Sequence, residues 1–316
     1  MTTLAVPAVH DVPARTSVRP LALIEAKRFA RHPLFLIGAV MCAILSYGHH
    51  GPEELDYHVI PSFFIGVLGL VVAARLTAST ERSAAVVDSA PKSETVRTAA
   101  MCLACLVPTV TGLAIVLMHR ATIAADPIPD FLYGTFGSFD RFVITVVVPV
   151  IACAGGPLLG VAVGRWLRFP GAALLAVLVV LIWSNIAAYV PGQSSRFGHL
   201  DGSTLFARTL HMVTPYTAFG SGNGDADIHT TVMTSYTGSP GWYAVWTLAL
   251  CGLAVCAALW RGATGEVRRL VGRSFVVLVA IALVSLVLAV VNGNQRLYET
   301  TRGGTSPVTV APHSGG

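Results

Sequence analysis

The sequence has 316 residues, of which 54% are hydrophobic and only 12% are charged. Soluble domains carry roughly 25% charged residues, so this composition excludes a soluble globular fold and a disordered chain and predicts an integral membrane protein. The formal net charge of +5 would suit nucleic-acid binding only if the basic residues gathered on one soluble surface.

The N-terminal region predicts two elements. Residues 1–18 are rich in Ala, Pro, Thr and Val and predict a disordered cytoplasmic tail. Residues 19–33 predict an amphipathic elbow helix in the inner membrane interface, because Pro20 suits a first helical turn and Pro33 ends the helix. Its apolar face is predicted to carry Ala22, Leu23, Ala26, Phe29 and Ala30. Its polar face is predicted to carry Glu25, Lys27, Arg28 and Arg31. The alternative is a plain cytoplasmic extension of the first membrane span.

Apolar runs then predict a polytopic, all-α membrane helix bundle. Six runs approach the roughly 20 residues that cross a hydrocarbon core of about 30 Å. A seventh run, at residues 34–47, covers only about 21 Å at 1.5 Å per residue. The predicted spans are 34–47, 59–76, 99–118, 142–164, 171–190, 242–260 and 274–291.

The distribution of basic residues decides whether the short first run is a span. If it is counted and the N-terminus is cytoplasmic, 15 of the 21 Lys and Arg residues fall on inner segments. That is the bias expected of cytoplasmic segments. The sequence therefore predicts seven spans with the N-terminus in the cytoplasm and the C-terminus outside. The positive charge follows this topology, which excludes nucleic-acid binding.

The inner loop at residues 77–98 predicts a short helix of its own. Thr80 can cap a helix that has Glu81 in its first turn, and Pro91 ends the helical pattern. We expect this helix at residues 80–90, below the membrane, with a new helix starting at Ser93. A plain connector is the alternative.

The outer segments are more polar. Residues 48–58 hold six side chains of the types that bind Zn or Cu, which are His49, His50, Glu53, Glu54, Asp56 and His58. Their spacing matches no defined metal motif, so we favour a solvated acidic loop over a metal site. The outer loop at 191–241 predicts a second interfacial helix at 203–213, and residues 292–316 predict a disordered outer tail.

Glycines and prolines mark the packing of the spans. Gly156, Gly160 and Gly164 are four residues apart, so they line one helix face and predict close approach of another helix, in this chain or in a second copy. Pro149 and Pro157 predict a kink or break in this span, and Pro108 predicts one in the preceding span.

The six cysteines all lie in apolar runs, which predicts no disulfide framework. Cys102 and Cys105 form a C-x-x-C pair, which we interpret as two small buried apolar side chains rather than a redox or metal site.

The chain carries no motif of an enzyme or of an energy-coupled machine. No phosphate-binding loop, nucleophile elbow or zinc-protease motif occurs, so we expect no enzymatic activity and no cofactor. None of the span cores contains the ionisable residue that ion-coupled transporters use. If the chain transports, a partner must supply the energy.

This layout resembles the permease subunit of an ABC-2-type transporter. The likeness lies in the elbow segment Leu21–Pro33, the inner helix after the second span and the outer amphipathic helix before the sixth. It covers residues 21–260. In that family the first helix is the connecting helix, and the loop between spans two and three holds the coupling helix. The resemblance assigns the coupling role to Glu81, Arg82, Val86 and Asp88. The family core has six spans, so residues 274–291 form an additional seventh.

The resemblance also implies partners and a function. A second permease chain, identical or a paralogue, and separate ABC ATPase subunits are expected, in the plasma or inner membrane of the cell. The implied function is export of an amphiphilic small molecule, drug or lipid. The alternatives are a scaffold or sensor that transports nothing, and a metal-handling ABC permease that uses the outer His-rich loop. A neighbouring reading frame for a soluble ATPase would separate the transporter from the scaffold.

Overall fold

The computed structural model describes residues 18–47, 59–82, 93–123, 137–167, 169–196, 222–223, 232–236, 239–291, 296–301 and 304–307. Helices make up most of this part of the chain. The helical elements are α1 (Val18–Ala30), α2 (Pro33–Tyr47), α3 (Val59–Pro61), the π-helix η3 (Ser62–Val67), α4 (Leu68–Arg82), α6 (Glu94–Ala104), α7 (Leu106–Ile123), α8 (Ser138–Phe142), the π-helix η5 (Val143–Val147), α9 (Val148–Trp166), α10 (Ala172–Arg196), α12 (Pro240–Trp260) and α13 (Gly265–Val291).

Four short strands form one antiparallel sheet with the order β1-β2-β3-β4. They are β1 (Gly222–Asn223), β2 (Val232–Tyr236), β3 (Arg296–Thr301) and β4 (Gly304–Pro307). β2 pairs with β3 in a register that sets Thr234 opposite Tyr298. β3 and β4 lie within residues 292–316, the segment that the sequence predicts to be a disordered outer tail.

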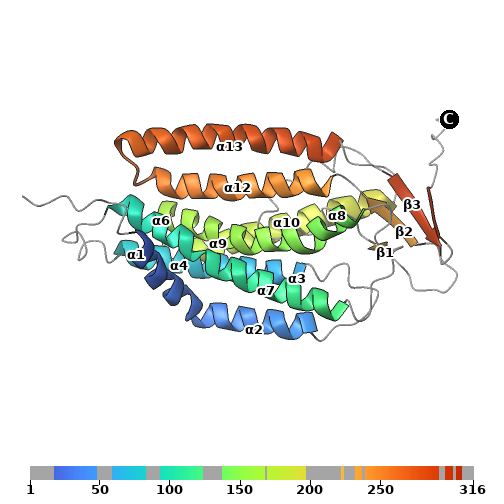
Figure 1. The fold of residues 1–316 in the computed structure, drawn as a ribbon, viewed down its shortest axis with the longest axis horizontal. Coiled ribbons are helices and arrows are strands. Elements are labelled where there is room, and N and C mark those ends of the chain that lie inside the picture. Colours follow the sequence, from blue (N-terminus) through green and yellow to red (C-terminus); the bar gives the residue numbers. More distant parts are fainter. Residues whose placement is uncertain are drawn as a thin grey trace, which may run out of the picture.

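The long helices lie side by side along the longest axis of the molecule (Figure 1). α4 packs closely on α9, α9 packs on α12, and α12 packs on α13. α13 lies at one outer edge of this arrangement and α2 at the opposite edge (Figure 1). We call the end that holds α1, the start of α6 and the α12–α13 turn the basic end, and the opposite end the sheet end.

The helices have the length and composition of membrane spans. Five helical runs qualify, at Ser62–Thr80, Glu94–Ala121, Ser138–Trp166, Pro240–Trp260 and Gly265–Ala289. The bent pair α1–α2 would make a sixth, and α10 contributes a shorter apolar stretch at Ala172–Ser184. Each predicted span thus falls on a helix.

The outside of the bundle is apolar, as a lipid-facing surface must be. Large apolar side chains are exposed along α2, α7, α10 and α13, among them Val40, Val110, Val179, Val276 and Val284. Only 17% of the most apolar stretch of α13 is buried inside the molecule, so most of this helix faces outward. These features define a multi-pass helical membrane protein.

Prolines interrupt the regular helical hydrogen bonding of two spans, near Pro108 and Pro149, whereas α9 continues through Pro157, where the sequence also predicts a kink or break. A proline cannot donate the helical hydrogen bond to the carbonyl four residues before it. Four residues before Pro108, α6 ends at Ala104, and α7 begins at Leu106. Four residues before Pro149 lies Thr145, inside the π-helix η5, where the helix widens to accommodate the lost bond.

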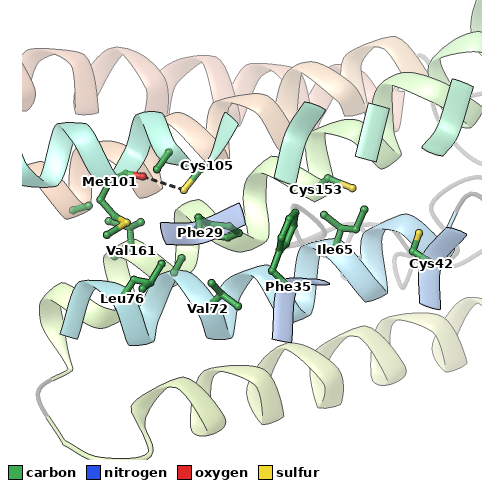
Figure 2. Close-up of a cluster of buried hydrophobic side chains, with 14 of the residues drawn as sticks. Phe29, Phe35, Cys42, Ile65, Val72, Leu76, Met101, Cys105, Cys153 and Val161 are labelled. Atoms are coloured by element: carbon green, nitrogen blue, oxygen red, sulfur yellow. Dashed lines mark hydrogen bonds between the residues drawn. The ribbon is translucent and has the colours of Figure 1, made fainter. Parts of the chain in front are cut away.

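One of the two apolar cores joins α1 and α2 to the centre of the bundle. Phe29 of α1 and Phe35 of α2 meet edge to face with ring centroids 5.2 Å apart. Around them gather Ile65, Val72, Met101 and Val161 from η3, α4, α6 and α9 (Figure 2). The buried cysteines Cys42, Cys105 and Cys153 belong to the same cluster. Six thiols are free in the structure, which fits their expected role as small apolar side chains.

Candidate partner-docking site at the basic end

The elbow helix α1 is held against the bundle rather than free in the interface. α1 packs chiefly on α6 and meets α2 at an angle of 63°. Phe29 is completely buried, whereas Lys27, Arg28 and Arg31 are exposed. Lys27 and Arg31 thus face the surroundings of the bundle, where a lipid headgroup or a protein can reach them.

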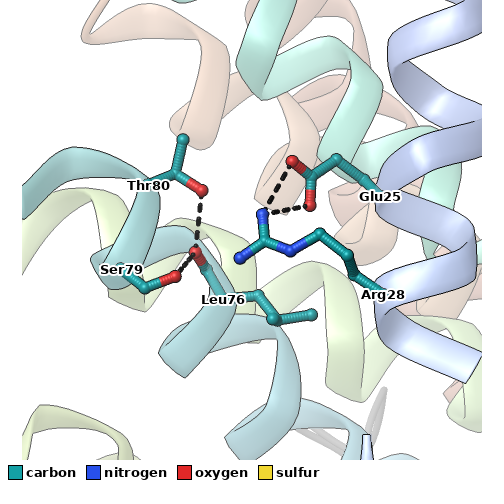
Figure 3. Close-up of polar contacts among 5 residues, drawn as sticks. All are labelled: Glu25, Arg28, Leu76, Ser79 and Thr80. Atoms are coloured by element: carbon teal, nitrogen blue, oxygen red, sulfur yellow. Dashed lines mark hydrogen bonds and ion pairs between the residues drawn. The ribbon is translucent and has the colours of Figure 1, made fainter. Parts of the chain in front are cut away.

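Glu25 lies on a different face from the one that the sequence predicts. We expected it on the outer, charged face, but only 6% of it is exposed. It is four residues before Phe29, so about 40° separates the two side chains around the helix and both turn inward. Its carboxylate accepts two hydrogen bonds from Arg28, at 3.0 and 2.9 Å (Figure 3). Leu23, expected on the buried face, is 64% exposed.

The coupling segment begins differently from the prediction. Thr80 does not cap a new helix, because α4 continues through it to Arg82. The hydroxyls of Ser79 and Thr80 both donate to the carbonyl of Leu76, at 2.8 and 3.0 Å, which satisfies the backbone inside α4 (Figure 3). Among the predicted coupling residues, Glu81 and Arg82 form the last turn of α4. Val86 and Asp88 lie outside the described residues, as does the rest of the expected helix.

After the undescribed segment 83–92, the chain re-enters the bundle with a capped helix. The hydroxyl of Ser93 accepts a hydrogen bond from the amide of Val96 at 3.4 Å, so Ser93 is the N-cap of α6 as the sequence predicts. The last turn of α4 and the first turn of α6 both lie at the basic end, next to α1 (Figure 1). A partner that binds residues 83–92 would therefore contact the same end as the elbow helix.

Arg165 is a functional candidate that the sequence analysis missed. We placed it in an inner loop, but it belongs to the last turn of α9 and is only 4% exposed. Its Nη2 lies 2.5 Å from the Oε1 of Glu94, at the start of α6. The spacing of the residues in α9 could have predicted that Arg165 is buried. Arg165 continues the row of Pro157 and Val161, four residues apart, which faces the protein interior.

The glycine face of α9 packs on the second span of the same chain. A Cβ on Gly156 or Gly160 would run into the backbone carbonyl of Gly66 or Leu70. A Cβ on Gly164 would lie 2.7 Å from the carbonyl oxygen of Ala74, closer than real side chains approach. The partner of this face, which the sequence left open between this chain and a second copy, is therefore η3 and α4.

The candidate metal ligands His49, His50 and His58 lie outside the described residues. Within the part of the chain that the structure describes, no group of three or more His, Cys, Asp or Glu side chains is placed to hold a metal ion. The described residues thus offer close packing and polar contacts between helices, and one group of these polar contacts lies at the basic end.

Comparison with protein-family models, with curated proteins and with solved structures finds no match for this chain. The function proposed below is therefore argued from the sequence and the geometry of this chain.

Proposed function

We propose that this chain is the membrane subunit of an ATP-driven ABC transporter that exports an amphiphilic small molecule, drug or lipid. A second permease chain and separate ATPase subunits would complete the transporter. In this arrangement the basic end faces the cytoplasm, the sheet end faces outward, and seven helices cross the membrane.

The observation that carries the proposal is the grouping of three elements at the basic end. The bent elbow α1, the end of α4 and the capped start of α6 lie together, so the segment between α4 and α6 emerges beside the elbow (Figure 1). A soluble ATPase docked there would touch the segment that leads directly into two spans. Exposed basic residues on α1 would meet anionic lipid at the same level.

The apolar character of the bundle supports an amphiphilic or lipid substrate. The described span interiors are lined by apolar and small side chains, and the exterior is lipid-facing. The chain carries no nucleotide-binding motif, so the energy for directed transport would come from the docked ATPase.

The test is recovery of an ATPase by the purified chain. Wild-type chain is compared with the double reversal Arg82→Glu, Asp88→Arg, which keeps the net charge and lies outside the bilayer. The control is the double reversal Glu266→Arg, Arg269→Glu, which also keeps the net charge and lies in the exposed first turns of α13 at the same end.

If the proposal holds, wild type and the α13 control recover the ATPase equally and the Arg82/Asp88 variant recovers much less. Removing a buried interfacial charge pair typically costs about 2–5 kcal/mol of binding free energy. Failure of wild type to recover any ATPase would favour a scaffold or sensor. Equal recovery by the wild type and both variants would leave segment 83–92 without a docking role.

A further inference from the structure

Three helices are joined pairwise at the basic end by polar contacts that the apolar bundle does not require. Glu94 of α6 pairs with Arg165 of α9, with the carboxylate oxygen 2.5 Å from Nη2. The hydroxyl of Thr95, also in α6, donates to the carbonyl of Gly262 after α12, at 2.6 Å. The indole N–H of Trp166, the last residue of α9, donates to the carbonyl of Ala257 in α12, at 2.8 Å. We call these six residues the three-helix tie.

The tie is compact as well as polar. A Cβ on Gly262 would lie 3.2 Å from the Nη2 of Arg165 and 3.3 Å from the Cβ of Glu94. The backbone after α12 therefore rests directly on the Glu94–Arg165 ion pair. The two hydrogen bonds from Thr95 and Trp166 flank this contact, so α6, α9 and α12 meet at one point.

The ion pair makes the tie hard to open. Arg165 is 4% exposed, whereas the side chain of Glu94 is 50% exposed. Separating a buried guanidinium from its carboxylate is unfavourable, because the charge has already lost much of its hydration. The ion pair therefore favours movement of the first turn of α6 together with α9.

The position of Glu94 gives the tie a role in transmission. Glu94 and Thr95 directly follow Ser93, the first residue after segment 83–92. Any displacement imposed on that segment reaches Glu94 within two residues. On the other side, Gly262 belongs to the turn that joins α12 to α13.

We propose that the three-helix tie makes the basic ends of α6, α9 and α12 one rigid unit, which carries movement of segment 83–92 into α12 and its turn. Glu94 and Arg165 are positioning residues in this unit. The inference rests on the proposed function, because an ATPase supplies the movement.

The experiment follows movement at the far side of the tie. Thr264 is exposed in the α12–α13 turn, and five of the six native cysteines are buried. A Thr264→Cys variant, bound to the ATPase in nanodiscs of phosphatidylethanolamine and phosphatidylglycerol, is labelled with a maleimide with and without ATP and vanadate. The labelling rate of this cysteine reports whether the turn moves when the ATPase is trapped.

In this background we expect ATP and vanadate to change the labelling rate several-fold. Glu94→Gln should abolish the change while ATPase recovery stays at the starting level. The charge swap Glu94→Arg, Arg165→Glu should restore a large part of it, which a purely structural loss would not allow. The matched control Glu266→Gln removes an exposed carboxylate at the same end and should leave the change intact.

Thr95→Val is a second test of the tie in case Glu94→Gln does not fold. It removes only the hydrogen bond from Thr95 to the carbonyl of Gly262. A response that persists in Glu94→Gln, or in Thr95→Val if Glu94→Gln does not fold, would overturn the inference. So would the lack of any response in the Thr264→Cys background once the ATPase is bound.

If wild type recovers no ATPase, the proposed function fails and the tie is tested in the chain alone. Thermal unfolding of Glu94→Gln, Arg165→Gln and the double variant then forms a double-mutant cycle. A smaller loss of Tm in the double variant than the two single losses together supports the rigid unit. Additive losses contradict it.

Discussion

Gly156 of α9 lies directly against the backbone carbonyl of Gly66 in η3, with no room for a methyl group between them. This contact is the first of three along the line where α9 packs on the second span, which we call the α4–α9 seam. The other two are Gly160 on Leu70 and Gly164 on Ala74. Small residues let two helix backbones approach, and in a membrane this close packing replaces much of the hydrophobic driving force of soluble proteins.

Gly156→Ala is expected to destabilise the protein by about 1–3 kcal/mol or more, because the atoms it meets belong to a backbone that cannot rotate away. Gly137→Ala is the control, since a Cβ there has nothing within 4 Å and the backbone φ is −65°. Thermal unfolding in detergent measures both. Equal Tm values for the two variants would show that α9 and the second span can move apart at this contact without loss of stability.

The elbow depends on one aromatic anchor. Phe29 is fully buried against Phe35, so Phe29→Ala should lower the free energy of unfolding by about 3–5 kcal/mol. Leu23→Ala removes an apolar side chain of the same helix that is exposed, and should change stability by about 0.5 kcal/mol or less. Comparable losses in the two variants would mean that α1 is held by something other than its inward face.

The α1–α2 bend should weaken in acid because of His32. The Nδ1 of His32 accepts a hydrogen bond from the amide of Leu34 at 3.3 Å, so the ring caps the start of α2 in its neutral form. Burial, and then the charge of Arg75, lowers the pKa of His32 below its usual 6.5. The unfolded chain then binds the proton more readily, so the stability from this cap is present above about pH 6.5 and is lost as the pH falls.

His32→Asn keeps a capping acceptor that does not titrate in this range. The Tm of wild type should fall more steeply than that of His32→Asn between pH 7.5 and pH 5.5. Parallel Tm profiles would remove His32 as the source of the acid sensitivity.

The proposed topology has a direct labelling test. Single cysteines at Ser17, Ser83 and Gly265 should be protected from a membrane-impermeant maleimide in intact cells. Cysteines at Glu54, Asp130, Asp225 and Thr305 should react. Labelling at Ser83, or protection at Thr305, would contradict seven spans with a cytoplasmic N-terminus.

The sequence predicts the helices well because apolar length is a strong signal. Each predicted span falls on a helix, and the interruptions near Pro108 and Pro149 follow from the missing proline N–H, although α9 continues through Pro157. The form of each break was not predictable. A turn at Cys105 and a π-helix at Val143–Val147 are both ways to accommodate a lost bond, and neighbouring helices decide between them.

Side-chain direction was predicted less well. The face of α1 was assigned from its apolar residues, although a charged Glu25 faces inward and an apolar Leu23 faces outward. A helical wheel places Glu25 and Arg28 as neighbours three residues apart, but assigning faces by polarity alone leaves out that this pairing lets a carboxylate turn inward. The ion pair of Arg165 was missed for a related reason, since its partner Glu94 is distant in sequence and only the fold brings them together.

The α12–α13 hairpin has a consequence for biosynthesis. α13 packs mainly on α12, through small residues such as Ala282, Ser285 and Ala289, and the amide of Ser239 closes the hairpin on the carbonyl of Ala289 at 3.0 Å. α13 leaves the ribosome after the other helices that the structure describes. Those helices can therefore assemble around the α4–α9 seam before α13 is made, so that α13 is added to their outer side.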